Sequence, residues 1–371
     1  TEIGAIMRVG IPPEIKNNEY RVAITPAGVS ELARRGHDVI VQAGAGAGSA
    51  ITDDDFKVAG AEIIDGADQV WAEADLLLKV KEPIEPEYSR MRKGQTLFTY
   101  LHLAASRPCT DALLKSGTTS IAYETVQTTG SDGSVALPLL APMSEVAGRL
   151  SAQVGAYHLM RTQGGRGVLM GGVPGVAPAK VVVIGGGMAG DNAAAVAWGM
   201  GAHVTVFDLN INTLRKIDAE YGGAIETRYS SRLDLETAVQ EADLVIGAVL
   251  VPGAKAPKLV TNETVAQMKP GAVLVDIAID QGGCFEDSTP TTHDNPTFTV
   301  HNAVFYCVAN MPGAVPRTST YALANATMPY VLKLADKGWQ GACFSDASLA
   351  KGLSTHDGQL LNAEVARDLD L

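Results

Sequence analysis

The residues whose types and spacing most clearly suggest chemistry form a glycine-rich run between an apolar segment and an Ala-rich one. Residues 180–184 are almost all valine and isoleucine, and they lead into a G-x-G-x-x-G pattern formed by Gly185, Gly187 and Gly190. The first glycine permits a tight turn, the second lets backbone approach a pyrophosphate, and the third allows close packing of helix on strand. The N-terminus of the following helix favours a phosphate group. The pattern predicts a dinucleotide site.

An acidic residue completes this motif. The next predicted strand, residues 203–207, runs into Asp208, where a dinucleotide site requires a carboxylate for the ribose hydroxyls. A carboxylate would repel a 2′-phosphate, so the sequence favours NAD over NADP. Asp191 would also repel a pyrophosphate, and we expect it to point away from the phosphates and act structurally. A second glycine run, residues 44–48, has the wrong spacing and is predicted to be a plain turn.

Other polar residues stand near the ends of predicted strands, where α/β sheets bind ligands. Arg21 and Lys81 could together hold a carboxylate, Arg21 through its bidentate fork and Lys81 as a point charge. From the residues alone, two solvated surface cations remain the alternative interpretation.

Three further residues could act on a bound substrate. His102 follows a predicted strand and is suited to proton transfer near neutral pH, although a His between leucines can also be a core residue. Asp280 follows the apolar segment 273–279 and competes for the same role with Asp276 inside it. Asn310 closes the last predicted strand and could hold a carboxamide or a substrate.

The elements that must position these residues alternate between strand and helix. In the first part of the chain, Thr25 and Pro26 predict the N-cap and first residue of a helix over residues 26–35, and Gly36 predicts its end. Ser144 is predicted to cap a helix over residues 144–162, which we interpret as the bridge into a second domain. The predicted strands are residues 7–11, 38–42, 76–80, 96–100, 119–123, 181–184, 203–207, 244–246, 273–277 and 305–308.

This alternation predicts an α/β protein of two domains, each with a mostly parallel, doubly wound, Rossmann-like sheet. A long helix over residues 318–334 suggests that the chain returns to the first domain. We therefore predict a discontinuous substrate domain, residues 1–138 plus 317–371, an NAD-binding domain, residues 139–316, and an active site in the cleft between them.

The bulk composition excludes several classes of protein. The chain has 371 residues and a formal net charge of −12, which disfavours nucleic acid as a partner. Its four cysteines show no metal-ligand spacing, so we expect no metal site and four buried thiols. No signal-peptide pattern or long apolar run is present, and we expect a cytoplasmic protein with no membrane partner. Met7 looks like the natural start, with residues 1–6 as a short extension.

Long runs of the chain closely resemble bacterial alanine dehydrogenases, from Met7 onward. The resemblance implies NAD-dependent oxidative deamination of L-alanine to pyruvate and ammonia, the reverse amination, some reaction of glyoxylate, and a cytoplasmic homohexamer. The matching runs are residues 16–26, 78–83, 101–104, 140–145, 275–283 and 301–321.

The same resemblance implies roles for particular residues. Arg21 and Lys81 would bind the substrate carboxylate and carbonyl oxygen, and His102 and Asp280 would handle protons. Asn310 would lie at both the substrate and the nicotinamide. The remaining cofactor contacts implied by the resemblance are Ser144, Ser230, Val249, Leu250, Ile277 and Met311, with Asp280 also beside the cofactor.

Three alternatives remain from sequence. An NAD(H)-binding subunit related to transhydrogenase shares this architecture but would not need a His beside a substrate clamp. A catalytically silent NAD-binding protein would bind NADH without turning over pyruvate and ammonia. Another amino-acid dehydrogenase of this fold, such as the saccharopine type, would need a larger cleft for its longer substrate.

Overall fold

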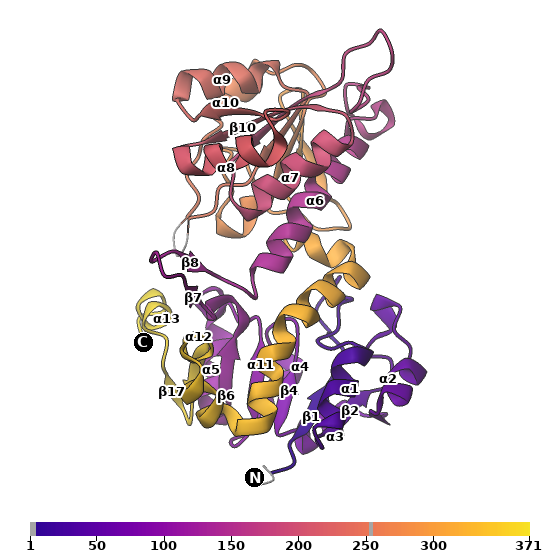
Figure 1. The fold of residues 1–371 in the computed structure, drawn as a ribbon, viewed down its shortest axis with the longest axis vertical. Helices are drawn as coiled ribbons and strands as arrows, with labels where there is room; N and C mark the ends of the chain where they lie inside the picture. The colour runs from indigo at the N-terminus through magenta and orange to yellow at the C-terminus, as the bar shows by residue number, and fades with distance from the viewer. Residues whose placement is uncertain (1–4, 252–254) are drawn as a thin grey trace. The chain divides into compact units, whose positions relative to one another are not determined.

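The computed structural model describes residues 5–251 and 255–371 (Figure 1). Most of the predicted N-terminal extension, residues 1–6, therefore lies outside the described residues. The chain forms two compact units, one up to Met143 together with Val315–Leu371, and the other Ser144–Ala314. The chain enters the second unit along α6 (Ala141–His158) and rejoins the first at the start of α11 (Pro316–Ser345). The first unit is therefore discontinuous in sequence.

An eight-stranded sheet, with strand order β17-β16-β6-β5-β4-β1-β2-β3, is the centre of the first unit. Strands β1 to β6 are parallel to one another, whereas β16 is antiparallel to both β6 and β17. The order of β1 to β6 reverses between β1 and β4, and the carboxyl ends of such a strand pair are where doubly wound sheets bind ligands. The strands are β1 (Arg8–Ile11), β2 (Asp38–Gln42), β3 (Glu62–Ile64), β4 (Leu76–Leu78), β5 (Thr96–Thr99), β6 (Thr119–Ala122), β16 (Leu353–His356) and β17 (Gln359–Leu360).

Five helices of the first unit, α1, α2, α5, α12 and α13, begin at side chains that satisfy free backbone N–H groups. Thr25 Oγ1 accepts a hydrogen bond from the Gly28 N–H at 3.4 Å, and Thr52 and Asp55 form a reciprocal capping box at α2. The helices of this unit pack apolar faces on the sheet, as α3 does with Val70 and Trp71. They are α1 (Pro26–Arg34), α2 (Asp53–Ala59), α3 (Ala67–Glu73), α4 (Glu85–Tyr88), α5 (Arg107–Ser116), α11, α12 (Ala347–Ala350) and α13 (Ala363–Asp368).

A seven-stranded sheet, ordered β11-β10-β9-β12-β13-β15-β14, is the centre of the second unit. All neighbouring pairs are parallel except β14 with β15. Strands β9, β12 and β13 are apolar almost throughout because helices cover both faces of a parallel sheet. The strands are β9 (Lys180–Ile184), β10 (His203–Asp208), β11 (Glu226–Tyr229), β12 (Leu244–Gly247), β13 (Val273–Asp276), β14 (Thr297–Val300) and β15 (Ala303–Tyr306).

The second sheet has the strand order of a dinucleotide-binding Rossmann fold, with β9 as the first strand at the point of reversal. Four helices follow its strands: α7 (Met188–Gly199), α8 (Ile211–Tyr221), α9 (Arg232–Glu241) and α10 (Asn262–Ala266). Two 3₁₀ helices, η5 (Ile277–Gln281) and η6 (Met311–Ala314), carry candidate site residues.

The predicted fold class is confirmed, since each unit has a mostly parallel, doubly wound sheet. The predicted cap at Ser144 is wrong, because α6 begins at Ala141 and Ser144 lies inside its first turn. The glycine run at residues 44–48 is a turn that leads into a 3₁₀ helix, as predicted. Cys343 is only half-buried, so the expectation of four buried thiols is wrong for that residue.

None of the helices in the described part of the chain is both long and apolar enough to span a membrane.

Candidate functional site

The glycine pattern adopts the strand-turn-helix geometry that the sequence predicts. Gly185 directly follows β9 and has φ +98°, a conformation that L side chains rarely adopt. A Cβ on Gly190 would lie 1.7 Å from the Gly185 carbonyl oxygen, so only glycine lets α7 pack this closely against the turn. A Cβ on Gly187 would meet no atom within 4 Å, so open space lies in front of this backbone. Two of the glycines shape the turn, and the third leaves room beside it.

Asp208 stands at the carboxyl end of β10 with a fixed side chain. Its Oδ2 accepts the Gly186 N–H at 2.8 Å, and its Oδ1 accepts the Asn210 N–H at 2.8 Å. Each carboxylate oxygen keeps further acceptor capacity after one such bond. The carboxylate is therefore held against the glycine turn and can still accept bonds from ribose hydroxyls.

Asp191 makes its contacts with the neighbouring helix α8. The Tyr221 hydroxyl donates to Asp191 Oδ1 at 2.7 Å, and burial together with this carboxylate raises the pKa of Tyr221. The prediction that Asp191 acts structurally agrees with this contact, which engages the carboxylate on a residue of α8.

A cavity of about 710 Å³ opens beside the glycine turn, within the range usual for small-molecule and cofactor sites. Its wall includes backbone of the turn, the carboxyl ends of β9 and β10, and the segment after β12. Six of the predicted cofactor residues line it: Gly185, Gly187, Asp208, Ser230, Val249 and Leu250. A dinucleotide site requires glycine backbone that the pyrophosphate can approach, a helix N-terminus and an oriented carboxylate. All three are present here, so the residues of this cavity fit a dinucleotide cofactor.

Other predicted residues of the second unit lie outside that cavity. The sequence suggested that Asp280 ends a strand, but β13 already ends at Asp276. Asp280 lies on η5 and is exposed, and Ile277 on the same 3₁₀ helix is half-buried. Asn310 lies four residues beyond the end of β15 at Tyr306, whereas the sequence predicted a strand that continues to residue 308. Its backbone is left-handed, with φ +61°, and its carbonyl accepts a bond from His293 Nε2 at 3.0 Å. Met311 is buried at the start of η6.

The structure distinguishes Asp280 from its rival Asp276. The Asp276 side chain is fully buried and accepts bonds from the Ala278 and Cys284 N–H groups at 3.0 and 2.9 Å and from the Ser288 hydroxyl at 2.5 Å. Burial raises the pKa of Asp276, and these donors oppose the rise. Asp276 thus closes the turn after β13, whereas Asp280 is exposed to solvent and to ligands.

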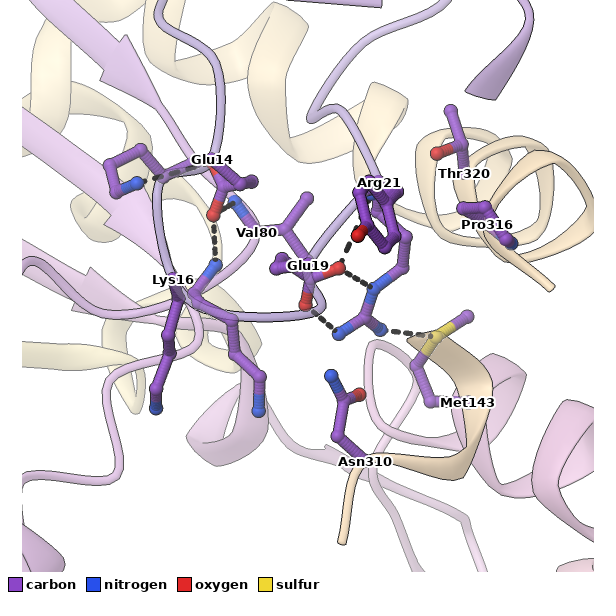
Figure 2. Close-up of polar contacts among 12 residues, drawn as sticks. Glu14, Lys16, Glu19, Arg21, Val80, Met143, Asn310, Pro316 and Thr320 are labelled. Carbon is purple, nitrogen blue, oxygen red and sulfur yellow. Dashed lines mark hydrogen bonds and ion pairs between the residues drawn. The ribbon is translucent and has the colours of Figure 1, made fainter. Parts of the chain in front are cut away.

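In the first unit, Arg21 lies on the loop between β1 and α1, at the point of strand reversal. It is 3% exposed, and its Nε and Nη2 donate to the two Glu19 oxygens at 2.9 and 2.5 Å, while Nη1 contacts Met143 Sδ at 3.2 Å (Figure 2). Burial disfavours the charged guanidinium, but the Glu19 carboxylate outweighs it and raises the pKa of Arg21. The loop is also held from α11, because Thr320 Oγ1 accepts the Val22 N–H at 3.1 Å.

Lys81 follows β4, the strand beside β1. Burial, and secondarily the charge of Arg21, lower the pKa of Lys81 below its ordinary value. Within the described part of the chain, the Lys81 ammonium forms no ion pair. The interpretation of Arg21 and Lys81 as two solvated surface cations is therefore wrong: Arg21 is buried, and the two charges act on one another.

His102 follows β5, the next strand of the sheet, with a left-handed backbone of φ +46°. Its ring is exposed, so it is not a core residue, and it stacks on Tyr100 with the ring centroids 6.3 Å apart. Glu124 accepts the His102 N–H at 2.7 Å and fixes this conformation. The buried Tyr100 is also close enough to Arg21 for that charge to oppose the raised pKa of its phenol. Arg21, Lys81 and His102 thus gather at one edge of the first sheet.

Sequence reasoning missed the carboxylates that hold these residues, namely Glu14, Glu19 and Glu124. Each accepts bonds from a candidate residue or from its backbone. A Glu in a loop is ordinarily solvated, so the sequence gives no reason to select these three. Only Glu19 lies inside one of the runs that resemble alanine dehydrogenases, residues 16–26. Within residues 5–251 and 255–371, no group of three or more His, Cys, Asp or Glu side chains could hold a metal ion.

The fold and the site define an α/β protein with two Rossmann-like units. The second unit has the features of a dinucleotide site, and the first brings together two cations and an exposed histidine. Models of the alanine dehydrogenase/PNT family match the chain, the N-terminal domain over residues 10–147 and the C-terminal domain over residues 151–363. The chain belongs to the alanine dehydrogenase/PNT family, as the resemblance in its sequence predicted.

Individual relatives are similar over nearly the whole chain. The alanine dehydrogenase of Mycolicibacterium smegmatis is 83% identical and that of Mycobacterium tuberculosis 76% identical, each over 98% of this chain and 97% of the relative. A solved L-alanine dehydrogenase superposes with a TM-score of 0.94 at 50% identity, covering 98% of this chain and 99% of the other. A transhydrogenase from Sinorhizobium meliloti gives 0.80 at 27% identity, covering 96% and 99%.

Proposed function

We propose that this protein is an enzyme that oxidises L-alanine to pyruvate and ammonia with NAD and catalyses the reverse reductive amination. One observation carries the proposal. This protein, which is 83% identical to an alanine dehydrogenase, has Arg21, Lys81 and His102 together at the edge of its first sheet where such sheets bind ligands. The transhydrogenase relative is more distant, at 27% identity. A silent NAD-binding protein would not need this trio.

Arg21 and Lys81 hold the substrate in this proposal. The guanidinium binds the carboxylate of alanine or pyruvate, and Glu19 keeps it charged and oriented. The Lys81 ammonium binds the carbonyl oxygen of pyruvate. Fixing the substrate in one orientation can contribute up to about 7–11 kcal/mol to lowering the barrier.

His102 and Asp280 move protons. Both side chains are exposed in their own units and therefore accessible to substrate and water. In deamination they activate water for attack on the imine, and the carbinolamine then collapses to pyruvate and ammonia. His102 is suited to this exchange because an imidazole ring can both accept and donate a proton.

The second unit binds NAD, which supplies a hydride acceptor when bound. The Gly187 backbone and the N-terminus of α7 hold the pyrophosphate, and Gly185 and Gly190 shape the turn around it. Asp208 accepts bonds from the ribose hydroxyls and disfavours a 2′-phosphate, which selects NAD over NADP. Ser230, Val249 and Leu250 line the same cavity. Ser144, Ile277, Asn310 and Met311 are proposed as further cofactor contacts, with Asn310 also contacting the substrate.

The proposal extends to the setting of the enzyme. We place it in the cytoplasm as a homohexamer, with alanine, pyruvate and ammonia as its small-molecule partners. Analytical ultracentrifugation of the full chain tests the hexamer.

NADH consumption at 340 nm, with pyruvate and excess ammonium, tests the reaction. We expect turnover that requires ammonium, prefers pyruvate to glyoxylate and 2-oxoglutarate, and uses NADH rather than NADPH. NADH binding without turnover would refute the enzyme and favour a silent NAD-binding protein.

A further inference from the structure

A buried ionic cluster lies directly behind the proposed substrate site of the first unit. Lys79, the residue after β4, places its ammonium 3.1 Å from Glu14 and 3.1 Å from Glu87. The three side chains are at most 3% exposed. Buried charges are costly unless they are paired and hydrogen-bonded. We therefore ask which parts of the chain the charges of this cluster hold in place.

The two carboxylates of this cluster hold different parts of the chain. Glu14 Oε1 accepts the N–H groups of Val80 and Lys81 at 3.2 and 2.7 Å, while its Oε2 meets Lys79 (Figure 2). Glu87 makes the same contact with Lys79, but its other bond comes from the Ile84 N–H at 3.1 Å, beyond the segment that carries Lys81. Of these two carboxylates, only Glu14 accepts a bond from the backbone of Lys81. The Lys81 carbonyl accepts from Thr99 Oγ1 at 3.0 Å, so Glu14 holds the N–H side of this residue.

This contact lies at the point where the strand order reverses. Glu14 follows β1 and Lys79 to Lys81 follow β4, and these strands are parallel neighbours with Val9 opposite Leu76. The bonds from Glu14 therefore tie together the two chain segments that leave the ligand-binding edge of the sheet. Because one of them fixes the peptide N–H of Lys81, it also fixes the direction in which the Lys81 side chain leaves the backbone.

We propose that Glu14 is a positioning residue for substrate binding: its carboxylate, anchored by Lys79, fixes the backbone of Lys81 so that the ammonium meets the oxygen of a 2-oxo acid. The choice of substrate class rests on the proposed function. Lys79, with two carboxylate partners, is not available to a ligand, so the cluster separates a structural lysine from a substrate-binding one two residues later.

Other charges act on Lys81 from the surrounding elements. Arg21 and Lys16 lower its pKa, and Glu82 and Glu19 raise it, all less than burial does. Glu14 is not among these principal influences, so its effect on Lys81 acts through the backbone. A variant at Glu14 should consequently change where the Lys81 ammonium lies more than whether it is charged.

Glu14→Gln and Glu87→Gln form a matched pair for the test. Each replaces one carboxylate partner of Lys79 by an amide of nearly the same shape. In the wild-type chain, one Glu14 oxygen accepts from Lys79 and the other from the Val80 and Lys81 backbone. In Glu14→Gln, one of these two positions becomes an NH₂ group, which is a donor only, so the side chain cannot accept on both sides. In Glu87→Gln, the bonds of Val80 and Lys81 remain. The thermal midpoints of the two variants should fall by similar amounts.

The first measurement is amide hydrogen exchange of the full chain without ligands. We expect the Val80 and Lys81 amides to exchange at least about tenfold faster in Glu14→Gln and at the wild-type rate in Glu87→Gln, since protection follows the free energy of local opening. Equal exchange in the two variants would overturn the assigned role of Glu14 in holding this backbone.

The second measurement is steady-state reduction of pyruvate with ammonium and NADH. Glu14→Gln should raise the KM for pyruvate about tenfold, with kcat and the KM for NADH within about threefold, as expected when binding energy common to ground and transition states is lost. Glu87→Gln should leave the pyruvate KM within about threefold. Equal changes in both variants would show a merely structural cluster. If the wild-type chain turns over no pyruvate, the proposed function fails, and the exchange rates alone decide whether Glu14 holds Lys81.

Discussion

Replacement of Gly190 and Gly187 by alanine should separate the two tasks of the glycine turn. A Cβ on Gly190 would lie 1.7 Å from the Gly185 carbonyl oxygen. The oxygen is a backbone atom and the backbone also fixes the position of the Cβ, so no side-chain rotation can relieve the clash. Overpacking a well-packed site usually costs about 1–3 kcal/mol, and a backbone clash this close should cost about 3 kcal/mol. Gly190→Ala should therefore destabilise the second unit strongly.

Gly187→Ala is the matched control because the same methyl group would meet nothing within 4 Å. The backbone there, φ −70° and ψ −163°, is extended and open to any residue. Loss of glycine should even stabilise the chain by about 0.4–1 kcal/mol through the unfolded state. The methyl group would, however, occupy the space in front of the backbone where we propose the pyrophosphate, and NADH should bind at least about tenfold more weakly.

Thermal unfolding and NADH fluorescence titration together test this pair. For a unit of this size, about 3 kcal/mol corresponds to a fall of about 6–12 °C in the unfolding midpoint. Gly190→Ala should show this fall, and Gly187→Ala should show none while losing affinity. A Gly190→Ala protein with the wild-type midpoint, or a Gly187→Ala protein that binds NADH normally, would refute the reasoning.

Three further predictions concern single side chains. Asp208→Ala should weaken NADH binding and narrow the preference for NADH over NADPH, which kinetics with both cofactors would measure; an unchanged preference would contradict the role of Asp208. Asp191→Asn should not tighten NADH binding, since Tyr221 already engages that carboxylate, and tenfold tighter binding by titration would contradict this. Because burial and the nearby Arg21 lower the pKa of Lys81, its charge is lost on the alkaline side before that of an ordinary lysine. The KM for pyruvate should therefore rise with pH below 10.5, and Lys81→Met should abolish this rise; a rise that persists in the variant would assign it to another group.

The dinucleotide motif could be predicted from sequence because its parts are adjacent along the chain. Gly185 to Gly190 form one continuous turn, and Asp208 ends the next strand, so spacing alone determines how they meet. The parallel strands were likewise visible as short apolar runs. Strands such as β11 and β14 were missed because edge strands are exposed and carry polar residues, which hides the apolar pattern.

The substrate residues were harder to assign because their environment comes from distant parts of the chain. Arg21 could have been a surface cation, and only the fold brings Glu19, Met143 and the sheet edge around it. Ser144 was misplaced because Ala141 to Met143 already continue the helical pattern. The cleft as the site of reaction stays a prediction, as does the joint action of His102 and Asp280.

The discontinuity of the first unit has a consequence for the newly synthesised chain. The loop of Arg21 is held by Thr320, and β6 pairs with β16 through Ile121 opposite Leu353, so both supports emerge from the ribosome after the whole second unit. Domains tend to fold as units while synthesis proceeds. The nucleotide-binding unit can therefore be complete while the pocket for the amino acid still lacks its final helix and strand. During translation, competence to bind cofactor would precede competence to bind substrate.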